Sequence, residues 1–413
     1  MSATGGVASS HAASQTQAHT ITGKLTVLFA VAVGVIVTNL FAPQTLIGLI
    51  GPSLGMSPAE GSLVAMTTLL GYAAGLFLLV PLADLAENRR LIALMLGGGV
   101  AASVAAVFAP GAGTLLGVLF VLGACCSAIQ ILVPIAASMA APERRGRVIG
   151  DVMSGLMVGI LLARPMASFL AGLWGWRAFY AASAAAMVVL AVVLVLCLPR
   201  RQPAVRSAYL RLIASLWHLL RGEPALRRRS LTASLMMAAF SLFWTSVALR
   251  LAQPPFDLGQ RGIALFALAG AGGAVVTPLF GWLGDRGWTR AATLAAHFVL
   301  VVAALLAFLG GCGAIPLRGL SLAVMVAGTV LIDVAVTGDQ TLGRRVINLL
   351  QPEARGRLNG LFVGLFFLGG AAGSGLAGLA WTLGGWHAVC AAIALMGGAA
   401  IMVDWVGGRS SSE

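Results

Sequence analysis

The chain of 413 residues is 59% hydrophobic and only 9% charged, and its formal net charge is +13 at pH 7. A soluble domain carries about a quarter charged residues, so this composition excludes a water-soluble globular protein. The basic balance does not indicate nucleic-acid binding, because the arginines fall in short segments between apolar runs. We predict an all-α polytopic membrane protein, since the strand-like alternation of a membrane barrel is not seen.

Apolar runs of about twenty residues, the length that crosses a bilayer as a helix, follow one another along the chain. They predict twelve transmembrane helices, at 25–50, 59–83, 90–109, 113–138, 148–172, 177–198, 231–252, 262–284, 290–310, 318–340, 358–382 and 386–406. The expected organisation is a disordered cytoplasmic tail, a six-helix bundle, a basic cytoplasmic linker, a second six-helix bundle and a second tail, at 1–23, 24–198, 199–230, 231–406 and 407–413. The first tail lacks the basic start of a signal peptide.

One segment occurs twice in the chain. Residues 142–176 begin Pro-Glu-Arg-Arg-Gly-Arg and end Gly-Trp, and residues 352–386 begin Pro-Glu-Ala-Arg-Gly-Arg and end Gly-Trp. The same offset of 210 residues relates Gln130 to Gln340. We therefore predict two homologous halves, with the functional site where they face each other.

Basic residues are divided unevenly between the two sets of loops. If both termini are cytoplasmic, the cytoplasmic segments hold 21 of the 26 Lys and Arg residues. The opposite loops hold Arg177, Arg250, Arg261 and Arg318. The positive-inside rule therefore predicts cytoplasmic termini in a bacterial inner membrane.

The linker contains an amphipathic stretch. Tyr209, Leu212, Ile213, Leu216 and Leu220 share one helical face, with polar side chains opposite. This pattern is typical of a basic helix that lies on an anionic membrane surface. A simple tether between the two bundles is the alternative.

Two turns share an Asp that is followed five residues later by an Arg, at 81–90 and 281–290. Together with the six-plus-six spans, these turns resemble the major facilitator superfamily, whose loop signature is G-x-L-a-D-r-x-G-r-r. The second turn matches it more closely than the first. The resemblance implies the superfamily fold and a role as conformational gate for Asp84, Arg89, Asp285 and Arg290.

Further stretches resemble the bacterial drug-efflux-like, DHA1-type branch: 39–44, 71–75, Gln130 with Pro134, and 175–179. The antiporter signature of span five is kept only as Pro165, because Arg164 replaces the Gly before it. Span four has no Arg, although many proton-coupled relatives place one there. These departures argue against proton antiport but do not affect the prediction that the protein is a transporter.

Two charged residues lie well inside their spans, where burying a charge in the bilayer costs free energy and usually indicates a functional or structural role. Arg164 could bind an anionic group of a substrate or a carboxylate; it could also reach the surface or pair structurally. Asp333 is the best candidate for a group that carries a proton, with a helix cap or a structural hydrogen bond as the alternative. Asp339 is expected to be structural, and Asp404, near a span end, needs no special role.

The resemblance implies that spans one, four, seven and ten line a central cavity. The polar and aromatic residues in these spans are Asn39, Gln44, Gln130, Phe240, Phe243, Trp244 and Gln340. Amides and aromatic faces with few charges suit an amphipathic or weakly polar organic solute.

The sequence thus predicts a secondary transporter of small organic solutes that works by alternating access and is driven by the proton gradient in efflux. A proton-independent facilitator or an uptake carrier is the alternative within this class. A polytopic enzyme or sensor is the competing class, and the five histidines, among them His297, are too dispersed in sequence to suggest its site. No phosphate-binding loop is present. We expect a monomer in the lipid bilayer that uses no cofactor or metal and binds no nucleic acid.

Overall fold

The computed structural model describes residues 22–199, 209–351 and 354–409, and in these ranges the chain is helical without a β-strand. Most of the two predicted tails, part of the linker and the first two residues of the second repeat copy lie outside the described residues.

The first part of the described chain forms the helices α1 (Gly23–Phe41), α2 (Pro43–Ser53), α3 (Pro58–Leu78), α4 (Asn88–Val107), α5 (Ala112–Cys126), α6 (Ile129–Ser138), α7 (Arg145–Trp174) and α8 (Trp176–Cys197), with the short 3₁₀ helices η1 (Val80–Asp84) and η2 (Pro142–Arg144). The rest forms α9 (Tyr209–Gly222), α10 (Pro224–Leu251), α11 (Gln260–Ala267), η3 (Leu268–Ala271), α12 (Gly272–Asp285), α13 (Thr289–Gly311), α14 (Arg318–Leu350) and α15 (Arg355–Arg409).

Within these ranges, 10 helical segments are long and apolar enough to cross a membrane. The longest, α15, is two spans, because the backbone leaves helical geometry at Gly384 and Gly385. The helices α11 and α12, joined by η3, supply a further span that no single long helix provides. The fold is therefore an all-α polytopic membrane fold with the twelve predicted transmembrane helices.

The first span is interrupted in its second half. Pro43 is the first residue of α2, directly after Ala42, which caps the end of α1. Proline has no backbone N–H to continue the ladder of α1 but fits the first position of a new helix. The interruption matters for function because Gln44, the next residue, is fully buried and reaches α7.

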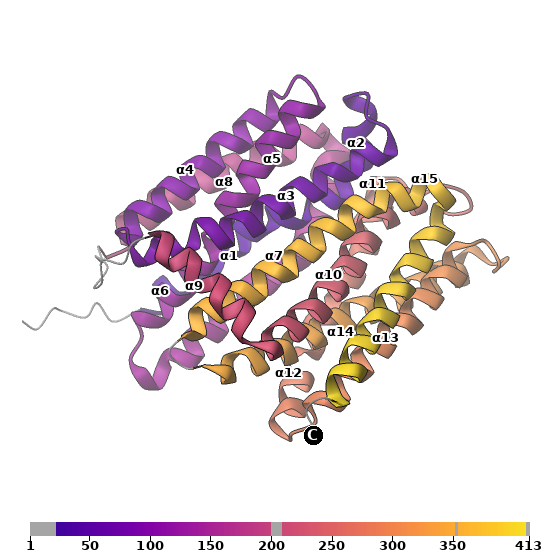
Figure 1. Cartoon of the computed structure of the whole chain (residues 1–413). Helices are drawn as coiled ribbons and strands as arrows, with labels where there is room; N and C mark the ends of the chain where they lie inside the picture. Colours follow the sequence, from indigo (N-terminus) through magenta and orange to yellow (C-terminus); the bar gives the residue numbers. More distant parts are fainter. Residues whose placement is uncertain (1–21, 200–208, 352–353, 410–413) are drawn as a thin grey trace, which may run out of the picture.

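Two groups of helices lie side by side (Figure 1). Helices α1 to α8 form the first group, and α10 to α15 form the second. Contacts between the groups run through α3 with α15, α7 with α11 and α2 with α10. We call the end that carries η1, α9 and the first turns of α10 and α15 the linker end, and the end that carries α2 and α11 the opposite end.

Glycine permits the closest approach of two helices within each group. A Cβ atom on Gly155 of α7 would overlap the backbone of Ala30 on α1, and one on Gly369 of α15 would overlap the backbone of Ser234 on α10. Small residues at such crossings allow backbones to touch, which is the usual basis of helix association in membranes.

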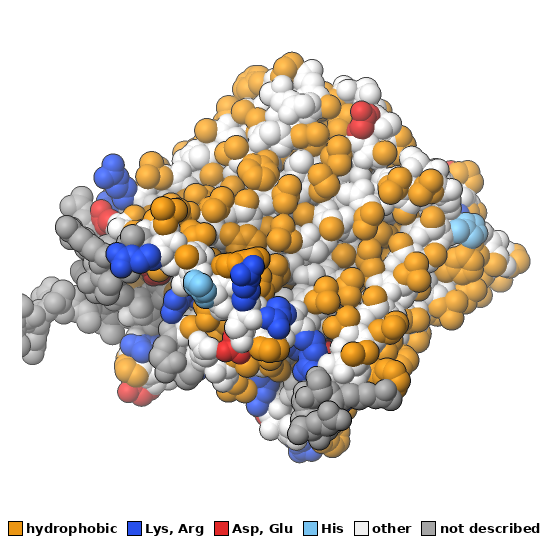
Figure 2. Space-filling view, in the orientation of Figure 1, with side chains coloured by type: hydrophobic (Ala, Val, Ile, Leu, Met, Phe, Trp, Pro, Cys, Tyr) orange, Lys and Arg blue, Asp and Glu red, His pale blue; other side chains and the backbone are white. Residues whose placement is uncertain are grey.

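The amphipathic helix of the linker is present as α9, but its apolar face packs on the protein. Tyr209 donates a hydrogen bond of 2.8 Å to the carbonyl of Leu78, and Leu216 and Leu220 pack against the hydrophobic core. Contacts with η1, α10 and α15 thus cover part of this face with protein, which is consistent with the alternative of a tether between the two bundles. Figure 2 shows Lys and Arg side chains gathered at the linker end, whereas hydrophobic side chains dominate the rest of this face.

Candidate functional site

An arginine is buried in an aromatic box at the centre of the molecule. Arg164 of α7 is 2% exposed. Its guanidinium carbon lies 4.1 Å from the ring centre of Trp244, 5.0 Å from that of Phe240 and 5.2 Å from that of Phe41. Nε of Arg164 donates a hydrogen bond of 3.0 Å to Oε1 of Gln44. Cation–π attraction within about 6 Å helps to hold a charge away from water, and the side chain points inward between the two groups.

Asp333 of α14 faces this box from the second group. It is 5% exposed and interacts electrostatically with Arg164, although no ion pair within 4.0 Å joins the two in the described structure. Trp244 is its neighbour: a Cβ atom on Gly270 would lie 3.2 Å from the Trp244 ring and 3.6 Å from Oδ1 of Asp333. Trp244 thus lies beside both Arg164 and Asp333, which form no direct ion pair in the described structure.

Four buried polar atoms at this centre have no hydrogen-bond partner among the described residues. They are Nε2 of Gln44, Nη2 of Arg164, Nε1 of Trp244 and Oδ2 of Asp333. An unpaired buried polar atom costs about 1–3 kcal/mol, so most such atoms in folded proteins are paired. The four side chains come from α2, α7, α10 and α14, two helices of each group. We call these four residues, with Phe41 and Phe240, the central site.

Two further residues that were predicted to face the cavity have contacts inside their own group. Asn39 is fully buried and accepts a hydrogen bond of 2.7 Å from Ser183, which ties α1 to α8. Phe243 packs against Trp386, with 5.9 Å between ring centres, and against Trp244, at 5.7 Å. Asn39 therefore joins two helices of the first group, and Phe243 supports Trp244 from the side.

The repeat-related glutamines occupy different surroundings. Gln130 donates a hydrogen bond of 3.3 Å to the hydroxyl of Tyr72, whose ring lies 4.6 Å from that of Phe367 on α15. The side chain of Gln340 is half-buried and makes no hydrogen bond with another described residue. Arg344, one turn further along α14, lies near Tyr72 of the first group. Arg344 was missed from sequence because it lies where a span was expected to have ended.

A cavity of about 560 Å³ opens between the groups at the linker end. Gln130, Asp84 of η1, Leu216 of α9 and Arg357 of α15 all line it. Asp84 is exposed and forms no ion pair with another described residue. The predicted gate residue therefore shares a water-accessible space with the first turn of α15, which belongs to the other group.

The remaining predicted gate residues form no ion pair with the other group of helices among the described residues. Asp285 forms an ion pair with Arg345 of α14, so its partner lies in the same group of helices. Arg290 is exposed and Arg89 is half-buried, and neither makes an ion pair with another described residue. The shared spacing of Asp and Arg thus produces no contact between them in either copy.

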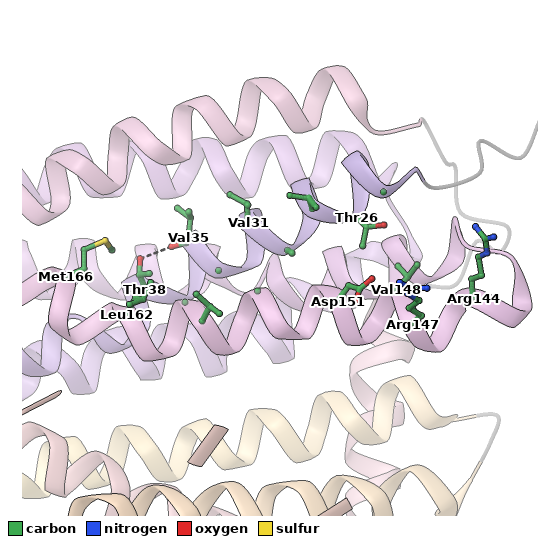
Figure 3. Close-up of a pocket in the computed structure, with 17 residues that line it drawn as sticks. Thr26, Val31, Val35, Thr38, Arg144, Arg147, Val148, Asp151, Leu162 and Met166 are labelled. Atoms are coloured by element: carbon green, nitrogen blue, oxygen red, sulfur yellow. Dashed lines mark hydrogen bonds between the residues drawn. The ribbon is translucent and has the colours of Figure 1, made fainter. Parts of the chain in front are cut away.

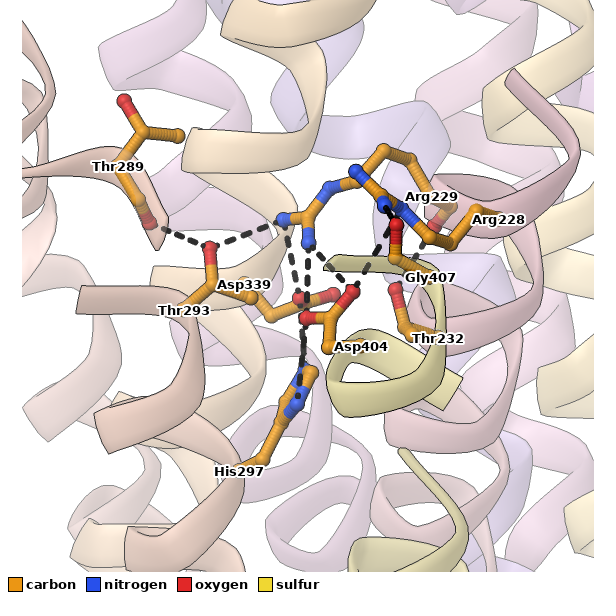
Figure 4. A network of polar contacts seen from close by, with 9 residues as sticks. All are labelled: Arg228, Arg229, Thr232, Thr289, Thr293, His297, Asp339, Asp404 and Gly407. Atoms are coloured by element: carbon orange, nitrogen blue, oxygen red, sulfur yellow. Dashed lines mark hydrogen bonds and ion pairs between the residues drawn. The ribbon is translucent and has the colours of Figure 1, made fainter. Parts of the chain in front are cut away.

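A second cluster of charges is buried inside the second group, near the linker end (Figure 4). Arg229 of α10 lies 3.4 Å from Oδ1 of Asp339 and 3.2 Å from Oδ2 of Asp404. His297 of α13 is fully buried, with Nε2 3.0 Å from Oδ1 of Asp339 and Nδ1 3.7 Å from Oδ2 of Asp404. Thr293 completes the set by accepting a bond of 3.1 Å from Arg229.

This cluster corrects two expectations. His297 is not isolated, and Asp404 has buried partners despite its place near the end of a span. The sequence could not show this, because the four helices α10, α13, α14 and α15 meet only through packing. Asp339 is bonded inside its own group, as expected for a structural residue.

Another cavity, of about 840 Å³, lies away from both charged clusters, along α1 and α7 (Figure 3). Val31 and Val158, which line it, are half exposed, so it is a groove on the outside of the first group. Arg144 and Arg147 stand at one end of it. Since it includes no residue of the central site, we do not assign it to the solute.

Comparison with known proteins points in one direction. The family model described as Major Facilitator Superfamily matches residues 27–339. The chain is 36% identical over 394 residues to "Uncharacterized transporter YgaY" of Escherichia coli O157:H7, which covers 94% of this chain and 97% of that one. It is 30% identical over 379 residues to "Probable transporter SCO4007" of Streptomyces coelicolor, covering 92% of this chain and 85% of the relative.

Solved structures agree on the fold. A bacterial homologue of the human lysosomal transporter Spinster, in an inward-facing and unoccupied conformation, matches with a TM-score of 0.69 at 16% identity, covering 94% of this chain and 96% of that one. The peptide transporter POT in complex with sulfate matches with a TM-score of 0.70 at 16% identity, covering 92% of each chain. At these identities the likeness shows the fold alone.

Proposed function

The chain belongs to the Major Facilitator Superfamily and is a multi-pass membrane transporter, and from this premise we propose that it exchanges protons for a weakly polar, amphipathic organic solute at the central site. The observation that carries the proposal is the convergence of buried polar side chains from both groups of helices on an aromatic box, among them Gln44 and Arg164, each with one polar atom that has no partner in the described structure. A solute with an apolar body and a few polar atoms would pack on the rings and satisfy those atoms.

Asp333 is the proposed proton carrier. It is buried, has the indole of Trp244 beside its carboxylate and interacts with the charge of Arg164. A solute that donates a hydrogen bond or brings a positive charge to Asp333 competes with a proton for the same carboxylate. Because the two ligands then exclude each other, this competition couples their movements in opposite directions. The drug-efflux-like resemblance of 39–44 and 175–179 favours efflux of the solute.

Arg164 is the proposed anchor of the solute. Its guanidinium is held by three aromatic faces and by Gln44, while Nη2 remains without a partner in the described structure. A fixed donor of this kind binds an oxygen acceptor of the solute without having to be reordered first.

We propose that the linker end is cytoplasmic, because it carries most of the basic residues, and that the membrane is the bacterial inner membrane. In the described conformation Gly172 of α7 meets Gln260 of α11 at the opposite end, whereas a cavity separates Asp84 from Arg357 at the linker end. We assign this conformation to the state that is open toward the cytoplasm. Closure of the cavity would bring Asp84 to the first turn of α15, where a helix N-terminus favours an anion.

The central site accounts for transport with side chains alone, so we propose a transporter without cofactor or enzymatic activity that works as a monomer. The six-plus-six arrangement within a single chain supports a site between the two groups and a monomer as the working unit. Rocking of one group against the other would expose it to each side in turn.

The test is proton movement in proteoliposomes that contain the full-length protein and an internal pH dye, with a panel of amphipathic drugs and small metabolites. We expect at least one solute to change the internal pH. The variant Asp333→Asn should lose this change and keep exchange of labelled solute against unlabelled solute. Asp151→Asn, at an exposed acid on the surface of α7, is the matched control and should behave as the wild type.

Solute flux without any pH change would contradict proton exchange and identify a proton-independent facilitator. The absence of an arginine from span four favours that alternative. A solute-dependent pH change that survives in Asp333→Asn would remove Asp333 from the coupling. Chemical conversion of the labelled solute would identify an enzyme instead.

A further inference from the structure

The linker-end cavity of about 560 Å³ stops short of the central site. Gln130 and Phe77 of the first group and Gly360 of α15 line this cavity, and no central-site residue of the described structure does. Phe41 and Phe240, which belong to the central site, are only 4% and 7% exposed. In this conformation a barrier therefore lies between the cavity and the site.

Phe367 of α15 is part of this barrier. The centre of its ring lies 4.6 Å from that of Tyr72 on α3, with 77° between the ring planes, and 6.3 Å from that of Phe41 on α1. The contact with Tyr72 has the edge-to-face geometry that aromatic pairs prefer. The hydroxyl of Tyr72 accepts a hydrogen bond from Gln130, which lines the cavity, and the ring of Phe41 packs against Arg164 in the central site. Phe367 therefore lies between a ring on the cavity side and a ring of the site.

Both groups of helices contribute to the barrier. Tyr72 and Phe41 belong to the first group, whereas Phe367 belongs to the second. Phe77 of the first group packs against α15 in the same way, since a Cβ atom on Gly364, three residues before Phe367, would overlap its ring. Contacts between the groups are lost when the groups move apart, so the rocking movement that exposes the site would also open the barrier.

The barrier has a consequence for the buried polar groups behind it. Tyr72 and Phe367 are 2% and 8% exposed, so their rings shield the site from water that enters the cavity. Gln44 and Arg164 keep their unpartnered polar atoms on the far side of these rings. In water these atoms would bind solvent, which a solute would then have to displace.

We propose that Phe367 is a gating residue: its ring, packed against Tyr72 and Phe41, closes the passage between the linker-end cavity and the central site. A solute passes when the ring leaves this position. The proposal rests on the central site as the place where the solute binds, and it names the side chain that controls access to that place from the linker end.

The test is the accessibility of the central site to a water-soluble reagent, measured on the full-length protein in lipid nanodiscs. Phe240→Cys places a thiol in the site, and a negatively charged methanethiosulfonate reagent modifies that thiol if it can reach it. Mass spectrometry of the peptides follows each cysteine separately, so the native cysteines remain in place. Because thiol exchange depends on access, we expect Phe367→Ala to raise the rate of modification about tenfold or more over Phe240→Cys alone.

Matched variants in the same Phe240→Cys background identify the ring as the cause. Tyr72→Phe should keep the slow rate, since the ring of Tyr72 and not its hydroxyl meets Phe367, whereas Tyr72→Ala should raise the rate from the other side of the barrier. Phe308→Ala, which removes a ring that packs against His387 in the second group, should have no effect. Cys390 is 3% exposed, and its slow reaction in each variant reports an intact fold.

Equal rates of modification with and without Phe367→Ala would overturn the proposal, and so would an equal rise in Phe308→Ala. If Cys390 becomes reactive in Phe367→Ala, that variant has loosened the fold, and Tyr72→Ala decides in its place. The measurement requires no solute. Failure of solute-driven proton movement would therefore contradict the proposed transport and leave the result for Phe367 intact.

Discussion

Asp333 and Asp339 lie on the same helix, six residues apart, yet belong to different charge systems. Asp333 faces Trp244 of its own group and Arg164, which belongs to the other group of helices. Asp339 instead forms hydrogen bonds with Arg229 and His297, both in its own group. Six residues correspond to about 9 Å along a helix. One rigid element therefore holds a carboxylate of the proposed transport site and a carboxylate of the buried charge cluster around Arg229.

The two carboxylates should differ in their effect on stability. Removing one partner from a buried charge cluster costs about 3–5 kcal/mol, because the remaining charge is left uncompensated. We expect Asp339→Ala to lower the free energy of unfolding by this amount and Asp333→Asn to leave it nearly unchanged, since Asp333 makes no direct ion pair in the described structure. Thermal unfolding of the purified protein in one detergent measures both. Equal losses for the two variants would contradict the separation.

Much of this arrangement was predictable from sequence, and the limit has a physical cause. Arg164 and Asp333 stand out because a charge inside an apolar run is rare. His297 and Asp404 do not stand out, since a histidine and a charge near a span end are unremarkable in sequence. Their proximity arises from the crossing of four helices that are apolar on most sides, and a helix that is apolar all round does not show which face it turns inward.

The face of α9 illustrates a related limit. The sequence shows its apolar stripe, but such a stripe indicates only that this face of the helix is buried away from water. Whether lipid or protein covers it depends on what lies nearby, and the first turns of α10 and α15 lie close enough to do so.

Arg164 should contribute to solute affinity through its shape as well as its charge. Lysine keeps the charge but lacks the flat fork that stacks on aromatic rings. We expect Arg164→Lys and Arg164→Gln each to weaken solute binding at least tenfold, equivalent to about 1.4 kcal/mol. Arg147→Gln, at an exposed arginine on the same helix, is the control and should keep the wild-type Kd. Binding of a transported solute, followed by calorimetry, gives the values. Unaltered affinity in Arg164→Lys would show that stacking plays no part.

The crossing of α1 and α7 should tolerate no side chain at its closest point. A Cβ atom on Gly155 would overlap the backbone of Ala30, whereas one on Gly150 of the same helix would meet nothing within 4 Å. Overpacking costs about 1–3 kcal/mol, and an open helical position gains up to about 1 kcal/mol from Gly to Ala. Gly155→Ala should therefore lower the melting temperature, while Gly150→Ala should raise it or leave it unchanged. The opposite order would mean that the two helices can separate freely at this point.

Asp285 should be coupled to Arg345 and not to Arg290. The ion pair with Arg345 joins α12 to α14, whereas Arg290 forms none with another described residue. Because the side chains are exposed, with 39% and 71% of their surface accessible for Arg345 and Asp285, the coupling energy should be only about 0.2–1 kcal/mol.

Two double-mutant cycles in thermal unfolding measure these couplings, one combining Asp285→Asn with Arg345→Gln and the other combining it with Arg290→Gln. The first should be non-additive and the second additive, since groups without contact act independently. If the cycle with Arg290 were the coupled one, the shared spacing of Asp and Arg would describe a direct ion pair after all. The ion pair of Asp285 with Arg345 lies within one group of helices. A change in transport rate in Asp285→Asn would therefore reflect the positioning of α12 against α14 and not a contact between the two groups.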